Sequence, residues 1–418
     1  MTVVRIEPLT RVEGTGRVEL QLDPAGRLQA VRLDLVESYR LFEQLVVGRA
    51  WHEVPSLVCR ICAICSGVHR LAAVAALEEA LALEIPPAAR LVRELLLLGG
   101  QIASHALHLY ALILPDLAGT ASILELLRQQ DAPARQGLAL KRLGNRLQEA
   151  AGGRVIHPVN IEVGGIVACP ARAELQALAA EVAGWEERAA PLLAPFRRAA
   201  AYPPGAAVIG VPLAVTAAGD YGLSGHVLAL PHGRTVAAAA YRELLGERAL
   251  ASSNAKRAEG AAGPFLTGAL ARLRLHHQRS GAAWAEVPAA AGIHGNNIAQ
   301  ASELVWALER SRAVLAALLA LPADAPLRRP VVATAGRGTA AIEAPRGTLI
   351  HHYLLDERGR VAHADIVTPT AINQVVMEQQ LWLDLQHAGD GAVLRARAER
   401  IVRAYDPCIS CSVHLLRV

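Results

Sequence analysis

Two pairs of cysteines, one near each end of the chain, have the spacing of metal ligands. Cys62 and Cys65 form the first Cys-x-x-Cys pair, and Cys408 and Cys411 form the second. Thiolates at this spacing can bind one soft metal from a single turn of backbone, and two pairs supply four ligands. Structural zinc sites usually take both pairs from one local unit, whereas almost the whole 418-residue chain separates these. We therefore expect a fold that brings its two ends together around a buried site.

The other two cysteines are not expected to bind metal. Cys59, Cys62 and Cys65 resemble the start of a ferredoxin cluster motif, but the fourth cysteine and the proline that should follow are absent, and His69 closes the stretch. We therefore interpret Cys59 and Cys169 as small buried hydrophobic residues.

Composition excludes several classes of protein. The net charge is only +4 and no run of Lys or Arg occurs, so nucleic acid is not an expected partner. The N-terminal segment lacks the apolar core of a signal peptide, which predicts a cytoplasmic protein with reduced cysteines. Residues 95–115 carry no charged side chain, but they include Gly99, Gln101 and His105. We predict a buried helix there and no membrane span.

The predicted fold is mainly α with a small antiparallel β edge (α+β), built as one large helical unit. Hydrophobic residues make up 53% of the chain and aromatic residues only 4%, which favours close-packed helices over an all-β fold. No repeat or linker is evident, so residues 1–418 are predicted to form a single domain. The expected helices are 39–50, 66–84, 88–114, 119–130, 134–151, 171–200, 236–246, 298–320 and 371–404. The expected strands are 3–7, 17–23, 28–36, 348–355 and 360–366, with further strands and turns within 202–235.

Taken together, the motifs resemble those of the large, catalytic subunit of nickel–iron hydrogenases. The resemblance covers essentially the whole chain, with the motifs in the family's order. The matching elements are Arg-Val-Glu-Gly at 11–14, Arg-x-Cys-x-x-Cys-x-x-x-His at 60–69, Glu-Ala-Pro-Arg-Gly at 343–347 and Asp-Pro-Cys-x-x-Cys-x-x-His at 406–414.

The resemblance implies a nickel–iron centre and a role for each cysteine. Cys62 and Cys408 would be terminal ligands of nickel, and Cys65 and Cys411 would bridge nickel to an iron that also carries one carbonyl and two cyanide ligands. Soft thiolates suit nickel. The implied reaction is the reversible, heterolytic cleavage of H2 to protons and electrons.

The same resemblance assigns roles to residues around that centre. Cys408 would be the first base and Glu13 would carry the proton onward, since a carboxylate in a dry pocket has a raised pKa. Arg346 would hold its guanidinium over the open site. Thr370 would donate a hydrogen bond to a cyanide, and Pro345 would lie beside the same cofactor.

A second metal is also implied. In the family a magnesium ion, sometimes assigned as iron, lies near the carboxy terminus. Its ligands here would be Glu43, His414 and the carbonyl of Ile366, of which the oxygen ligands suit magnesium. No iron–sulfur cluster is expected in this chain, so electrons would leave through an iron–sulfur small subunit.

Departures from the family pattern indicate a subgroup. Ser104 stands where membrane-bound members have Asp, the first cysteine pair reads Cys-Ala-Ile-Cys, and Thr15 replaces a histidine. These features resemble the α subunit of soluble NADP-linked bidirectional hydrogenases, or sulfhydrogenases. NAD(P)-reducing diaphorase and electron-transfer subunits would then be further partners, and a maturation endopeptidase would remove the tail at 415–418.

Three alternatives remain open at this stage. A hydrogen-sensing hydrogenase subunit would have the same cysteines, and a zinc or iron–sulfur structural subunit would bind one metal without H2 activity. A quinone-binding subunit of a respiratory complex shares the ancestry but has lost the cysteine pairs, so Cys62, Cys65, Cys408 and Cys411 argue against it.

Overall fold

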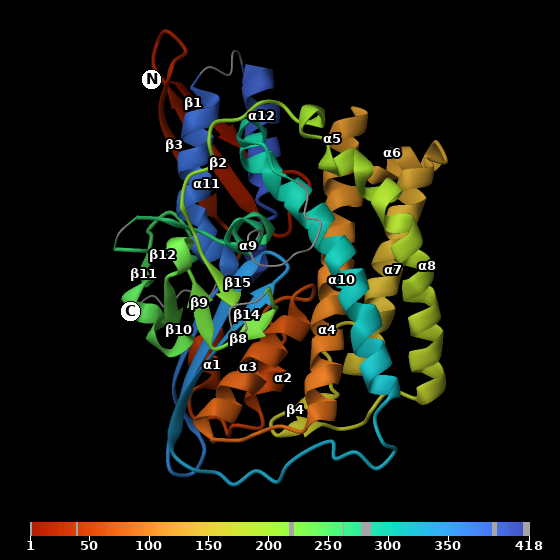
Figure 1. The fold of residues 1–418 in the computed structure, drawn as a ribbon. Helices are drawn as coiled ribbons and strands as arrows, with labels where there is room; N and C mark the ends of the chain where they lie inside the picture. The colour runs from red at the N-terminus through yellow and green to blue at the C-terminus, as the bar shows by residue number, and fades with distance from the viewer. Residues whose placement is uncertain are drawn as a thin grey trace.

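Long helices lie side by side on one side of the molecule, and the small sheets lie on the other side together with the C-terminal helices drawn in blue (Figure 1). The computed structural model describes residues 2–38, 41–216, 221–261, 263–276, 286–386 and 391–412. The helices are α1 (Phe42–Val46), α2 (Val54–Val58), α3 (Ser66–Ala80), α4 (Pro87–Ala106), the π-helix η1 (Leu107–Ile113), α5 (Leu114–Ala118), α6 (Ile123–Arg128), α7 (Ala132–Gly152), α8 (Arg172–Arg197), α9 (Ala269–His276), α10 (Gly295–Leu319), α11 (Pro369–Leu385), α12 (Gly391–Ala404) and α13 (Ile409–Ser412).

Helix α4 is the centre of the helical half and packs between α7 and α10. It begins at Pro87, where the fixed φ of proline suits the first turn of a helix. Its contact with α7 depends on glycines, because a Cβ on Gly144 would lie 2.4 Å from the backbone nitrogen of Ala103. The two backbones can therefore approach closely only because that position has no side chain.

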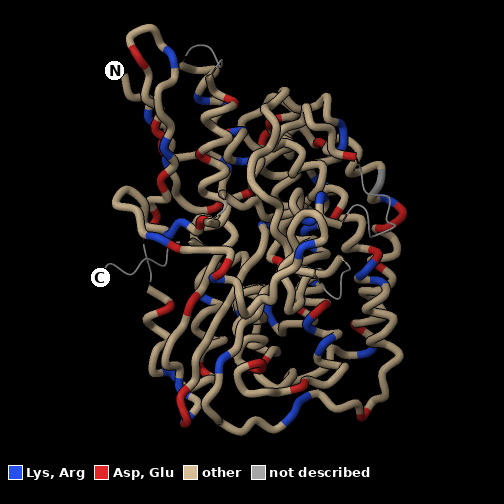
Figure 2. Tube along the Cα trace, turned by 60° about the vertical axis from the view of Figure 1, so that its left-hand side comes forward, with Lys and Arg blue, Asp and Glu red and all other residues tan. Residues whose placement is uncertain are grey.

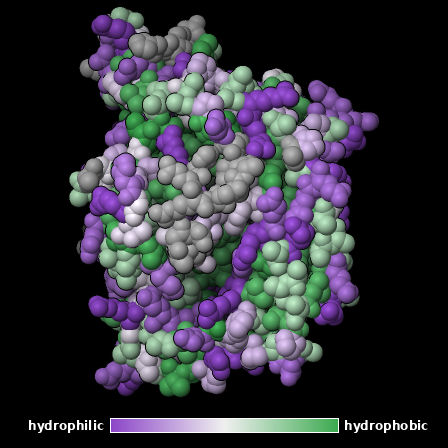
Figure 3. Space-filling model, in the orientation of Figure 1, coloured by the Kyte–Doolittle hydropathy of each residue, from purple (hydrophilic) through white to green (hydrophobic). Residues whose placement is uncertain are grey.

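The apolar segment Pro87–Ala118 is long enough to cross a membrane, but 83% of its most apolar window is buried within the fold. This confirms the prediction of a core helix. On the face shown in Figure 3, hydrophobic residues occur in separate groups between hydrophilic ones. Figure 2 shows acidic and basic residues intermingled along the chain, consistent with the small net charge.

In the described part of the chain, the strands form six small sheets, all antiparallel except the β13–β6 pair. Two of the sheets matter most for the site, because the first carries the N-terminal loop and the second carries the turn that contains Arg346. The sheets are β1 (Thr2–Ile6), β2 (Gly16–Leu22) and β3 (Leu28–Leu35); β16 (Val361–Val367), β15 (Gly347–Leu355), β14 (Gly336–Ala344) and β8 (Ser224–Gly225); β10 (Thr235–Ala237), β9 (Val227–Ala229) and β7 (Ala214–Thr216); β11 (Gly246–Ala249) and β12 (Lys256–Glu259); β13 (Phe265–Leu266) and β6 (Val211–Pro212); and β4 (Ile161–Glu162) and β5 (Gly165–Ile166).

Three predictions about secondary structure need correction. Strand β14 was not anticipated, because its Gly- and Ala-rich sequence lacks the β-branched and aromatic residues typical of strands. The predicted helix at 236–246 is instead the end of β10 followed by a 3₁₀ turn. The predicted helix at 371–404 is two helices, α11 and α12, and Gly391 begins the second of them. The N-terminal sheet, the 348–366 hairpin and the mainly helical architecture are confirmed.

Candidate metal centre

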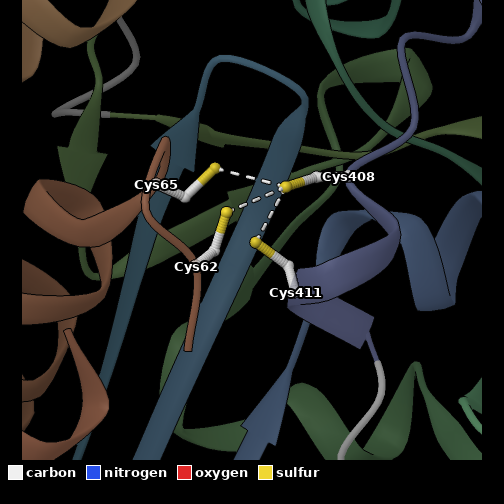
Figure 4. A group of neighbouring side chains, drawn as sticks. All are labelled: Cys62, Cys65, Cys408 and Cys411. Carbon is white, nitrogen blue, oxygen red and sulfur yellow. Dashed lines mark hydrogen bonds between the residues drawn. The ribbon is translucent and has the colours of Figure 1, made fainter. Parts of the chain in front are cut away.

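The four predicted cysteine ligands meet in the interior although they come from opposite ends of the chain (Figure 4). Their sulfur atoms all lie within 4.8 Å of one another and all four residues are buried. The Sγ of Cys408 is 3.5 Å from that of Cys62, 3.6 Å from that of Cys65 and 3.0 Å from that of Cys411. Four convergent, buried thiols are a donor set for soft metals, and the prediction that they come together is confirmed.

The N-termini of helices α3 and α13 present these cysteines. Cys62 and Cys65 lie in the loop between α2 and α3, and Cys65 is the residue immediately before the first turn of α3. A helix N-terminus favours a thiolate because its free N–H groups carry partial positive charge. Cys408 and Cys411 lie at α13, and a backbone bridge pairs Cys408 with Glu13. The N-terminal loop therefore fixes the position of the C-terminal pair.

The thiols influence one another's ionisation. Hydrogen bonds from Cys408 and Cys411 lower the pKa of Cys65, and the positive charge of Arg346 lowers it further. The contact with Cys411 raises the pKa of Cys408, which is also buried. Loss of a proton is therefore favoured at Cys65 over Cys408.

Arg346 lies over this cluster in the two-residue turn between β14 and β15. Its Nη1 is 3.8 Å from the sulfur of Cys65, and its Nε donates a hydrogen bond to Asp406 at 3.1 Å. Burial opposes the charge of this arginine, but Asp406 and the thiols outweigh it and raise its pKa. Arg346 is therefore a fixed, buried cation that faces the sulfur cluster. Asp406, which carries no predicted role, is the residue that fixes it.

Glu13 reaches the site from the N-terminal loop. Its carboxylate accepts hydrogen bonds from the backbone N–H of Ser410, at 3.2 Å, and from the Ser410 hydroxyl. Burial, and next the charge of Cys62, raise its pKa, while the Ser410 contact opposes the shift. The next residue must be glycine, because Gly14 has φ +83° and a Cβ there would lie 2.6 Å from the Cβ of Ile409. This close approach explains the Glu-Gly pair.

The two residues predicted to bind the cofactor also border the cluster. The hydroxyl of Thr370, in the first turn of α11, accepts a hydrogen bond of 2.9 Å from the backbone N–H of Cys408. Pro345 precedes Arg346 in the β14–β15 turn, and its carbonyl accepts a hydrogen bond from Arg272. Their contact with a cofactor stays a prediction.

Glu43, one of the predicted ligands of the second metal, belongs to a separate acidic group. The carboxylates of Glu43, Glu247 and Asp365 lie within 4.8 Å of one another. Lys256 lies among them, with its Nζ 2.7 Å from Glu43, 3.2 Å from Glu247 and 3.8 Å from Asp365. Ile366 contacts Glu43 through its N–H at 2.8 Å, so a ligand role for its carbonyl stays a prediction. His414 lies outside the described residues.

The sequence did not predict the other residues of this acidic group, because no sequence motif links them to Glu43. Glu247 and Lys256 lie on β11 and β12, far along the chain from Glu43. The prediction for Cys59 as a buried hydrophobic residue is confirmed, whereas that for Cys169 is wrong. Cys169 is exposed and lies in the irregular segment between β5 and α8.

Comparison with known proteins supplies the class. A sequence model of the nickel-dependent hydrogenase family matches residues 40–139, and another described as HoxL-like matches residues 3–38. The α subunit of sulfhydrogenase 2 from Pyrococcus furiosus is 35% identical, with all of both chains covered. The vhu F420-non-reducing hydrogenase of Methanococcus voltae contains a chain that is 31% identical over 91% of this chain and 97% of that relative. The crystal structure of an NAD⁺-reducing [NiFe]-hydrogenase in the H2-reduced state superimposes with a TM-score of 0.85 and 30% identity, covering 99% of this chain and 100% of that one.

The fold and the four-sulfur site therefore define a metal-dependent oxidoreductase. The chain belongs to the nickel-dependent hydrogenase family and is the catalytic large subunit of a nickel–iron hydrogenase. The buried cysteine cluster fits the nickel–iron site of that family. The names of the relatives differ in what they say of the electron acceptor, since one is described as NAD⁺-reducing and another as F420-non-reducing.

Proposed function

We propose that this chain carries out the reversible cleavage of H2 and passes the electrons first to a partner with iron–sulfur clusters and then to NAD(P). The observation that carries the proposal is the convergence of Cys62, Cys65, Cys408 and Cys411 in the interior. Four buried thiolates are soft donors, and they suit a nickel–iron pair whose iron holds one carbonyl and two cyanides. Such a centre, when bound, supplies heterolytic cleavage of H2.

The protein's own groups would then handle the proton and the charge. Cys408 would release the first proton to Glu13, whose raised pKa lets it accept and pass on a proton nearer neutral pH. Arg346 would hold a fixed positive charge over the open side of the cluster, where it costs no reorganisation during the reaction. Thr370 already bonds the backbone at Cys408 and would help to fix the cofactor pocket.

Infrared spectroscopy tests this proposal on the complex purified from its native host. We expect carbonyl and cyanide stretches that shift when H2 is added, with nickel present and with iron in excess of it, because the partner's clusters also contain iron. A complex without these bands, and with zinc or iron alone, would instead support a structural or electron-transfer subunit. Bands that shift under H2 without turnover of NAD(P) or another acceptor would support a hydrogen sensor.

The acceptor is proposed from the relatives rather than from this site. One similar structure is described as NAD⁺-reducing and other relatives are sulfhydrogenase α subunits. Diaphorase and electron-transfer subunits are therefore proposed partners, together with a maturation endopeptidase, in a cytoplasmic complex. Measuring H2-dependent reduction of NAD⁺ and NADP⁺ by the purified complex tests this choice.

An apolar surface beside the first cysteine pair is our proposed docking site for the iron–sulfur subunit. The loops that form it are connected, since His157 donates its backbone N–H to Ser66 at 3.1 Å. A partner bound here would bring its clusters near the cysteine loop, which electron transfer requires. The exposed apolar side chains of this surface are Ile64, Ile156, Val159 and Val167.

A charged substitution at this surface should release the partner. Val167 is 52% exposed, so Val167→Glu should fold normally but place an unpaired charge in the interface, which costs several kcal/mol. We expect at least about a tenfold loss of small subunit on co-purification. Leu124→Glu, on an equally exposed apolar residue of α6, should retain it. Equal retention by both variants would contradict the docking site.

We also propose a magnesium site at Glu43, with the Ile366 carbonyl and His414 as its other ligands and with the carboxylates of Glu247 and Asp365 beside it. Three carboxylates and the single ammonium of Lys256 leave a net charge of −2 when all are ionised, which a divalent cation would balance. Glu247→Gln should therefore lower the magnesium retained after dialysis while leaving nickel unchanged. Glu259→Gln, on the neighbouring strand and paired with Arg248, is the control. Unchanged magnesium in the Glu247 variant would remove this group from the proposal.

A further inference from the structure

A fully buried arginine lies behind the turn that carries Arg346. Arg272 is on α9 and has no exposed surface. Burying a guanidinium costs free energy unless each N–H donor has a hydrogen-bond acceptor. The acceptors around Arg272 therefore indicate what it holds in place. Among the described residues, its side-chain hydrogen bonds lead to α10 or to the end of β14 and its turn, just before Arg346.

The guanidinium is held by two carboxylates. Its Nε and Nη2 donate to the two oxygens of Glu303 at 2.6 and 2.7 Å, and its Nη1 donates to Glu343 at 2.6 Å. Glu343 is itself held through its other oxygen by the N–H of Val215 and the hydroxyl of Thr348, both at 2.7 Å. These contacts fix the guanidinium plane relative to α10 and the sheet.

The same guanidinium then grips the backbone of the turn. Nη1 donates to the carbonyl of Ala344 and Nη2 to the carbonyl of Pro345, each at 3.2 Å. Because Ala344 pairs with Gly347, the turn consists only of Pro345 and Arg346. Fixing the two carbonyls that precede Arg346 fixes the peptide planes from which its side chain departs.

We propose that Arg272 is a positioning residue for the hydrogenase reaction. It holds the carbonyls of Ala344 and Pro345 and so directs Arg346 toward the cysteine cluster. This inference rests on the proposed function. This role needs the planar, five-donor fork of arginine. A lysine at the same place keeps the positive charge but cannot donate to two carboxylates and two carbonyls at once.

A double-mutant cycle in the purified complex tests the proposal. Arg272→Lys, Arg346→Lys and the double variant are compared by H2/D2 exchange, nickel content and thermal midpoint. We expect about a 100-fold lower exchange rate for Arg346→Lys and about a 10-fold lower rate for Arg272→Lys, because misplacing a catalytic group slows the reaction. The double variant should be no slower than Arg346→Lys, since Arg272 acts only through Arg346.

Another buried arginine offers a matched control. Arg93 also forks onto one carboxylate, Glu78, and also donates to two backbone carbonyls, those of Glu162 and Gly165. Arg93→Lys should lower the thermal midpoint as Arg272→Lys does. The Arg93→Lys variant should keep the exchange rate per nickel within about twofold of wild type, because Arg93 holds the β4–β5 hairpin rather than the Arg346 turn.

The possible outcomes distinguish failure of the proposed role of Arg272 from failure of the proposed hydrogenase function. Rate losses that multiply in the double variant, or an equal loss in Arg93→Lys, would make Arg272 a merely structural residue. If Arg272→Lys does not assemble, Glu303→Gln loosens the same fork, and its rate loss must likewise disappear in the Arg346→Lys background. A wild-type complex that lacks exchange would contradict the proposed function rather than the role of Arg272.

Discussion

Replacing Cys65 with serine is expected to abolish assembly of the nickel–iron centre. The serine hydroxyl keeps nearly the same shape but does not ionise near neutral pH, so it cannot replace a soft thiolate ligand. Cys65 is also the sulfur that Arg346 approaches. Nickel and iron bound per large subunit should fall to near background, and H2/D2 exchange should be lost. Elemental analysis of the purified variant measures the first and mass spectrometry of the gas measures the second.

Cys59→Ser is the matched control for that experiment. Cys59 is buried three residues before Cys62, but its sulfur donates to the carbonyl of Ser56 at 3.4 Å rather than joining the cluster. A serine can make the same hydrogen bond, so metal content should remain at the wild-type level. A Cys65 variant that kept both metals and activity would overturn the ligand assignment.

Glu13→Gln is expected to leave the metals in place but slow proton transfer. The amide oxygen can still accept the hydrogen bond from the Ser410 N–H, so the loop should hold its position. An amide cannot accept and release a proton as a carboxylate does. The rate of H2/D2 exchange should therefore fall by about 100- to 10,000-fold, the range typical of general acid–base catalysis.

Glu19→Gln controls for loss of a buried carboxylate in the same part of the chain. Glu19 lies on β2 and pairs with Arg5 and Arg32, with no bond to the cysteine segments. We expect unchanged exchange per nickel for this variant. Unchanged exchange in the Glu13 variant as well would remove Glu13 from the proton path.

The sequence predicts those residues of the site that belong to short, local motifs. The spacing within Cys62–Cys65 and Cys408–Cys411 predicts metal binding, and the resemblance predicts Glu13, Arg346 and Thr370 beside them. The structure brings all of these to one place. Metal ligation itself depends on groups that the polypeptide must acquire, so the roles of these residues are predictions for the experiments above.

The rest depends on contacts between distant segments. Arg272 lies outside every predicted helix and motif, and only the tertiary structure places it behind the Arg346 turn. Lys256 and Glu247 likewise meet Glu43 because a β-hairpin packs over α1. Strand β14 was missed because tertiary pairing on both of its edges outweighs a weak local propensity.

The separation of the two cysteine pairs has a consequence for synthesis of the protein. Cys62 precedes Cys408 by 346 positions, and ribosomes add roughly 5–20 residues per second. The first pair therefore exists for roughly 20–70 s, at those rates, before the second pair is made. During that time two thiols that suit any soft metal ion are present without their partners. Correct metal loading must then wait until the nascent chain is complete, and delivery has to be controlled by timing as well as by affinity.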